Sequence, residues 1–101
     1  MIKLVVLYGQ PTDPAAFDTY YAETHVPLVA KIPDLQRFAY GKALGTPTGG
    51  QTPYYFMAEL WFENMQQLQA SMGSEAGQAA AHDSAAFATG GVTMFIAHAQ
   101  Q

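Results

Sequence analysis

The histidine at position 25 has the residue type and the spacing for acid–base chemistry. From Phe17, steps of three, four and eight residues reach Tyr20, Tyr21 and His25, so these four side chains share one face of a predicted helix. An imidazole on an apolar face can exchange a proton near neutral pH without much tuning. The alternative is a structural histidine, buried and bonded to a backbone carbonyl such as the one that Pro27 leaves without a donor.

Aromatic side chains with a polar atom are the candidate ligand contacts. Tyr20, Tyr21, Tyr40 and Trp61 could line a pocket and donate hydrogen bonds to a ligand oxygen. Any one of them could instead be an ordinary core residue.

Glu59 is a carboxylate within an otherwise apolar predicted strand, two residues before Trp61. A carboxylate in such a place needs a partner or a raised pKa. It is therefore a candidate ligand-binding residue. The alternative, which we favour, is an ion pair with Arg37 or Lys42 on the neighbouring strand.

The sequence lacks the motifs that metal sites, nucleotide sites and serine nucleophiles usually require. The chain has no cysteine, no His-x-x-x-His and no Gly-x-Ser-x-Gly, and we see no carboxylate–histidine set with metal-ligand spacing. Gly49-Gly50 falls in a predicted hairpin rather than before a helix, which argues against a phosphate site. We therefore expect no metal, no nucleotide, no serine–histidine–aspartate triad and no tightly bound cofactor.

Composition limits the partners. Of the 101 residues, 50% are hydrophobic and 12% are charged, with a net charge of −4 and only four basic residues. Four scattered cations cannot form the basic face that nucleic acids or anionic lipids require. The apolar N-terminus is too short for a signal peptide, and no run approaches the ~20 apolar residues of a membrane span. The expected location is cytoplasmic.

The pattern of apolar and turn residues predicts the order β-α-β-β-α-β. The predicted strands cover residues 2–8, 35–44, 54–62 and 92–99. The predicted helices run from about 13 to 31, kinked at Pro27, and over 64–72 and 75–88. This order is typical of the α+β ferredoxin-like fold, a four-stranded antiparallel sheet with its helices on one face.

The first and third strands, central in that fold, are apolar on both faces. The helices of one chain cover only one face of the sheet. A second copy of the sheet is the simplest cover for the other face, so we expect a homodimer formed through the sheet faces.

Two segments carry a resemblance to a known family. Residues 17–28 combine an aromatic pair with His25 and Pro27-Leu28, and residues 82–92 place Asp83 and Phe87 before the last strand. Together they resemble the signature of the EthD family, named for ethyl tert-butyl ether degradation, over essentially the whole chain as one domain. The resemblance implies a dimeric α/β barrel with a pocket between sheet and helices in each subunit. It also suggests a structural role for Asp83.

The wider superfamily includes lactone isomerases, polyketide-tailoring monooxygenases and cyclases, and dehydratases. We therefore expect an enzyme that performs proton transfer on a small oxygenated organic compound, with His25 as acid or base. Its reaction would be of the isomerase, dehydratase or cofactor-independent monooxygenase type. The alternative is a non-catalytic protein that binds a small molecule in a degradative pathway. A third option, haem ligated by His25, follows from barrel relatives that bind haem.

Overall fold

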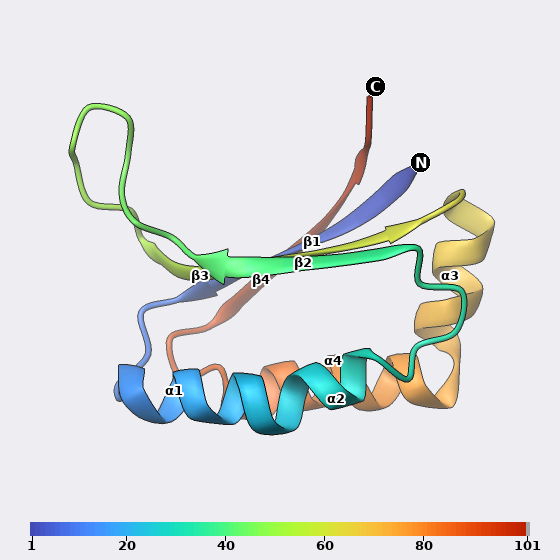
Figure 1. The fold of residues 1–101 in the computed structure, drawn as a ribbon, viewed down its shortest axis with the longest axis horizontal. Helices are drawn as coiled ribbons and strands as arrows, with labels where there is room; N and C mark the ends of the chain where they lie inside the picture. Colours follow the sequence, from blue (N-terminus) through green and yellow to red (C-terminus); the bar gives the residue numbers. More distant parts are fainter. Residues whose placement is uncertain (101) are drawn as a thin grey trace.

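The computed structural model describes residues 1–100 and confirms the α+β architecture (Figure 1). Its strands are β1 (Ile2–Gly9), β2 (Arg37–Lys42), β3 (Tyr54–Phe62) and β4 (Val92–His98). Its helices are α1 (Pro14–Tyr20), the π-helix η1 (Tyr21–His25), α2 (Val26–Val29), α3 (Met65–Gly73) and α4 (Glu75–Phe87). β2 is shorter at both ends than the predicted strand over residues 35–44.

The four strands form one antiparallel sheet in the order β2-β3-β1-β4, so β1 and β3 are central as expected. Leu4 of β1 lies opposite Leu60 of β3 on one side and Ile96 of β4 on the other. This register places alternate residues of the four strands on the same face of the sheet.

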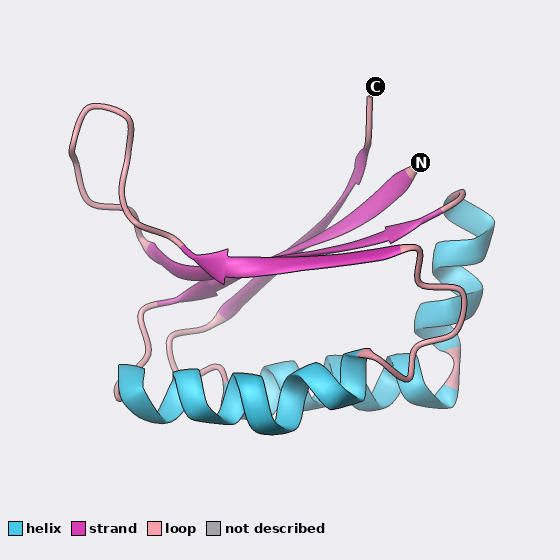
Figure 2. Cartoon of the chain, viewed as in Figure 1, coloured by secondary structure: helices cyan, strands magenta, loops and turns pink. Residues whose placement is uncertain are grey.

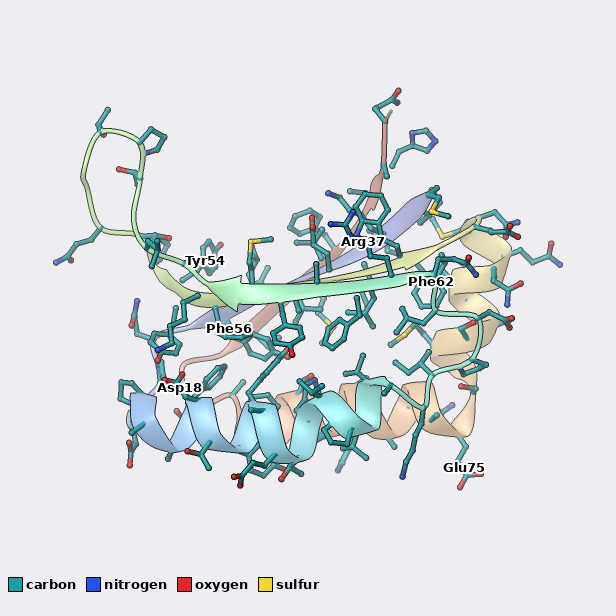
Figure 3. The ribbon with its side chains drawn as sticks, viewed as in Figure 1. Asp18, Arg37, Tyr54, Phe56, Phe62 and Glu75 are labelled. Atoms are coloured by element: carbon teal, nitrogen blue, oxygen red, sulfur yellow. The ribbon has the colours of Figure 1, made fainter. Side chains whose placement is uncertain are left out.

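All the helices lie on one side of the sheet, with α3 standing at one end (Figure 2). The core fills the space between the two layers. It includes Val6 and Tyr8 of β1, Phe17 of α1, and Phe56 and Phe62 of β3. Figure 3 shows Phe56 on the helix side of the sheet and Arg37 on the opposite side.

The first helix contains a widened turn where the sequence predicted a kink. Asp13 caps its N-terminus by accepting a hydrogen bond from the Ala16 amide. Residues Tyr21–His25 then form a π-helix, in which the Val26 amide bonds to the Tyr21 carbonyl. Pro27 has no amide hydrogen, and its ring crowds the preceding turn. A π-turn before it absorbs that mismatch, so the helix continues to Val29.

The second crossover brings α4 against η1. Ser74 ends α3 and caps α4 by accepting a hydrogen bond from the Gly77 amide. A side chain at Gly77 would collide with the backbone of Ser71 and Met72, so only glycine permits this tight junction. The junction fixes the part of α4 that faces the first helix.

The outer face of the sheet, on the side away from the helices, is largely apolar. Val5 pairs with Glu59 and with Phe95 in the register, which places all three on this face. Phe95 is 49% exposed. The hairpin between β2 and β3 projects beyond the sheet on this same side (Figure 1). In the described part of the chain, no helix has the length and apolarity needed to cross a membrane.

Candidate functional site

His25 lies at the end of the π-turn, inside the protein. The residue is 3% exposed, and its ring packs 5.0 Å from the ring of Tyr21 and 5.0 Å from that of Phe87 (centroid to centroid). The helical spacing therefore predicted both its burial and its contact with Tyr21.

One nitrogen of the His25 ring is held by Asp83 of α4. His25 Nδ1 lies 2.9 Å from Asp83 Oδ2, and the Tyr20 hydroxyl donates to Asp83 Oδ1 at 2.5 Å. Because Asp83 accepts on both oxygens, Nδ1 carries the proton and donates it to the carboxylate. This bond sets the tautomer of the ring and leaves Nε2 as a basic nitrogen.

The other nitrogen faces Ser84, the next residue of α4. His25 Nε2 lies 3.3 Å from Ser84 Oγ, which lies 3.1 Å from the Tyr8 hydroxyl. Because Nε2 is an acceptor, Ser84 donates to it, and Tyr8 donates to Ser84. The buried hydrogen bonds therefore run in one direction, from Tyr8 through Ser84 to His25.

Burial sets the charge of these groups. It lowers the pKa of His25 below its ordinary value, and the hydrogen bond and charge of Asp83 oppose this only in part. The imidazole is therefore neutral at neutral pH. Burial also raises the pKa of Tyr8 to about 12, and it raises the pKa of Tyr21. Both phenols are protonated donors under physiological conditions.

A small cavity adjoins His25 and Ser84. Its volume is about 20 Å³, which is room for a water molecule. The wall is mostly apolar, and its polar groups come from four residues: Tyr8, Tyr21, His25 and Ser84. Met94 of β4 also lines it and is 40% exposed, so the cavity approaches solvent beside this edge strand.

The Tyr21 hydroxyl is buried beside this cavity without a partner. The residue is 2% exposed, and its oxygen makes no hydrogen bond with any part of the chain that the structure describes. A buried hydroxyl without a partner costs free energy. A ligand or water oxygen in the cavity would supply the missing acceptor.

The structure separates the other predicted site residues. Tyr40 is 49% exposed and packs with its ring 5.4 Å from that of Tyr21, outside the cavity wall. Glu59 and Trp61 lie on the outer face of the sheet, because strand alternation points them away from the helices. The partner predicted for Glu59 was wrong: it pairs with Lys3, 2.6 Å away on the adjacent central strand β1.

Sequence reasoning missed Ser84 and Tyr8, and it gave Asp83 a structural role only. A signal for Ser84 was present, since Ala80, Ser84 and Phe87 share one helical face and a serine interrupts that apolar stripe. For Asp83, the resemblance to the family was the only signal. No local pattern could show its contact with His25, because the two positions are 58 residues apart in the sequence. The alternative considered for His25, a bond to a backbone carbonyl, is not what the described residues show: its ring nitrogens contact Asp83 and Ser84.

Neither a metal nor a haem fits this arrangement. Across residues 1–100, no group of three potential metal-ligating side chains comes together. Both nitrogens of His25 are occupied by protein groups, so neither is free to ligate a haem iron. The site therefore offers a base and hydroxyl donors rather than ligands for a cofactor.

Comparison with known proteins identifies the family. The family model for the EthD domain matches residues 9–91, including His25, Asp83 and Ser84. The chain belongs to the EthD family. An uncharacterized 11.0 kDa protein from the thcB–thcC intergenic region of Rhodococcus erythropolis is 45% identical over 95% of this chain and 92% of its own.

Solved structures agree with this assignment. The crystal structure of an ethyl tert-butyl ether degradation (EthD) family protein from Bacillus halodurans has 36% identity and a TM-score of 0.93 over 99% of both chains. Two more distant structures share the fold. A dimeric ferredoxin-like protein of unknown function from Jannaschia has 14% identity and a TM-score of 0.72, covering 98% of this chain and 100% of its own. A hydroxynitrile lyase from Passiflora edulis has 14% identity and a TM-score of 0.73, covering 95% and 90%.

Proposed function

We propose that this EthD-family protein binds a small, partly apolar, oxygenated organic compound between sheet and helices, and that His25 transfers a proton on it. The observation that carries the proposal is the pairing of a neutral, oriented imidazole with the unpartnered Tyr21 hydroxyl on one cavity. Such a pair suits proton abstraction beside a carbonyl, with the tyrosine stabilising the developing enolate oxygen. The hydroxynitrile lyase of the same fold supports a small-molecule reaction in broad terms.

The rival function is binding without catalysis. It is favoured by one specific observation: both His25 nitrogens already have protein partners. For proton transfer, Ser84 Oγ must yield its place at Nε2 to the substrate, or relay the proton itself.

A β,γ-unsaturated five-membered lactone, α-angelica lactone, provides the test. Its conversion to the conjugated isomer needs one proton removed beside the carbonyl and one returned, and ultraviolet absorbance follows it. We expect the wild type to accelerate the conversion and His25→Gln to lose about 100-fold or more of that rate. His82→Gln is the matched control, because it makes the same substitution on α4 at a histidine outside the cavity wall.

Saturable lactone binding, seen by protein NMR, with no acceleration would establish the binding role in place of catalysis. An equal rate in wild type and His25→Gln would remove His25 from the reaction. The absence of both binding and conversion would count against the pocket for this class of compound.

We also propose that the protein is a homodimer joined through the outer faces of its sheets. The Jannaschia protein of the same fold is dimeric. On this chain, the outer face carries exposed Phe95 and Met57, and Trp61 has a buried indole nitrogen with no partner in residues 1–100. A facing copy would cover the apolar side chains.

A further inference from the structure

Three side chains near the cavity have the connectivity of a nucleophilic triad. Ser84 Oγ lies 3.3 Å from His25 Nε2, and His25 Nδ1 lies 2.9 Å from Asp83 Oδ2. The sequence argued against a triad because it lacks the usual serine motif. The structure assembles one differently, with serine and aspartate on consecutive positions of α4 and the imidazole bridging them. We infer that Ser84 is a nucleophile for acyl transfer, activated by His25 and oriented through Asp83.

Each part has a defined role. Asp83 accepts the Nδ1 proton, so Nε2 is the basic atom that faces the serine. Tyr20 donates to the other oxygen of Asp83 and holds that carboxylate in place. Tyr8 donates to Ser84 Oγ, which leaves the serine proton directed at Nε2. A nucleophile, its base and the orienting carboxylate are therefore connected by hydrogen bonds before any substrate arrives.

The triad also needs a donor for the oxyanion. Ser84 lies within α4, where backbone amides are committed to the helix, so a side chain must serve. Tyr21 lines the same cavity, and its hydroxyl has no partner among the described residues. It would donate to the oxygen that becomes negative when the carbonyl is attacked.

The surroundings indicate the substrate class. The cavity has room for a water molecule as it stands, so an acyl group enters only if the exposed Met94 side chain at its edge moves aside; the walls are otherwise apolar. Met94 and Ile96 of β4 pair with Val6 and Leu4, so they face the helix side, yet they remain 40% and 43% exposed. These two side chains form an apolar surface along which the rest of the substrate could lie. Small uncharged esters and lactones match these features, since no cationic side chain lines the cavity to hold a carboxylate or phosphate.

The reaction has two balanced steps. Ser84 Oγ bonds to the carbonyl carbon while its proton passes to His25 Nε2; the ester C–O bond then breaks, and the leaving alkoxide takes that proton. In the second step, His25 deprotonates a water that attacks the acyl-serine, and the proton returns to Ser84 Oγ as the carboxylic acid departs. The inference rests on the proposed function in using the same pocket and the same basic nitrogen.

Acetyl transfer from p-nitrophenyl acetate tests the inference with the full-length protein. We expect a burst of p-nitrophenol and one acetyl group on Ser84, located by intact mass and peptide mapping. Ser84→Ala should remove the acetyl group and slow p-nitrophenol release by about 100-fold or more. Ser71→Ala is the matched control, because Ser71 is also buried in a helix but lies outside the cavity.

Two further variants examine the supporting roles. Tyr21→Phe should lower the acylation rate constant about 100-fold with little change in apparent affinity, as expected of an oxyanion donor. Asp83→Asn should slow acylation and also shift its dependence on pH, because Asp83 acts on the pKa of His25. A purely structural role for Asp83 would leave the pH profile unmoved.

The outcomes separate the two proposals. No acetyl group on Ser84 of the folded wild type, or acetylation only at other residues, overturns the triad. Lactone isomerisation that persists in Ser84→Ala would then leave the proton-transfer proposal standing. An acetyl-Ser84 without any lactone isomerisation would support the triad and remove the proton-transfer reaction.

Discussion

Asp83 holds the ring of His25 at 2.9 Å across 58 residues of sequence, joining α4 to the π-turn of the first helix. The contact depends on two local departures from regular structure. The π-turn before Pro27 sets the position of His25, and the tight junction at Gly77 lets α4 pack closely after α3. This hydrogen bond therefore joins the two crossovers of the fold.

Replacing Asp83 with Asn should lower the pKa of His25 further. Burial already lowers this pKa, and the carboxylate is the group that opposes burial. NMR titration of the ring protons would measure the change, with His25→Gln used to assign the signal. We also expect a loss of unfolding free energy of roughly 1–3 kcal/mol, because a part-buried carboxylate that accepts from two donors is replaced by an amide with one accepting oxygen. An unchanged or higher pKa in Asp83→Asn would show that the carboxylate does not act on the ring.

The same lowered pKa predicts how stability depends on pH. Below the ordinary histidine pKa of about 6.5, His25 of the unfolded chain binds a proton while the buried ring does not. The free energy of unfolding should therefore fall as the pH drops from 7.5 toward 5, by at most about 1.4 kcal/mol per pH unit from this residue. The loss should end once the pH passes below the pKa of the folded state.

Urea unfolding of the wild type and of His25→Gln across this pH range isolates the contribution of His25 to the pH dependence of the free energy of unfolding. The variant retains the other titrating groups, so the difference between the two curves belongs to His25. A difference that grows in favour of the wild type as the pH falls would reverse the sign and contradict the buried, neutral imidazole.

The two tyrosines of the cavity should respond differently to loss of their hydroxyls. Tyr8→Phe removes a donor to Ser84 and should cost about 1 kcal/mol of unfolding free energy. Tyr21→Phe removes a buried hydroxyl without a partner in the described structure, so it should be neutral or stabilising by up to ~1 kcal/mol. Urea unfolding of both variants at pH 7.5 makes the comparison. An equal cost for both would mean that Tyr21 is bonded in solution, for example to a water in the cavity.

The sequence predicted the strand order and the buried face of the first helix because both depend on local periodicity. Apolar residues continuous over β1 and β3 marked the central strands, and the steps from Phe17 to His25 marked the buried helix face. The sequence also placed a disruption at Pro27, although it did not show that a widened turn would resolve it.

The partners of His25 could not be found in the same way. Their contact depends on how α4 rotates and packs against η1, which residue spacing within either segment does not fix. The partner of Glu59 was missed for a related reason. Both strands that neighbour β3 carry basic residues, so the sequence alone left several possible partners for Glu59. The sheet register brings Lys3 of β1 within 2.6 Å of it.

Replacing Phe95 with Glu tests the proposed dimer. Phe95 is 49% exposed on the outer face, next to Val5 in the register, so a facing sheet would bury it. A carboxylate there would be desolvated, and the neighbouring cation of this face, Lys3, is already paired with Glu59, so the dimer should weaken by about 30-fold or more. Sedimentation at micromolar concentration should show twice the chain mass for the wild type. At the low end of that range, the variant should show the single-chain mass.

Leu44→Glu is the matched control, since Leu44 is 96% exposed on the β2–β3 hairpin. It should remain dimeric if the sheet faces alone form the contact. A wild type that sediments as one chain would end the dimer proposal, and a Phe95→Glu variant that stays dimeric would move the interface away from the outer face.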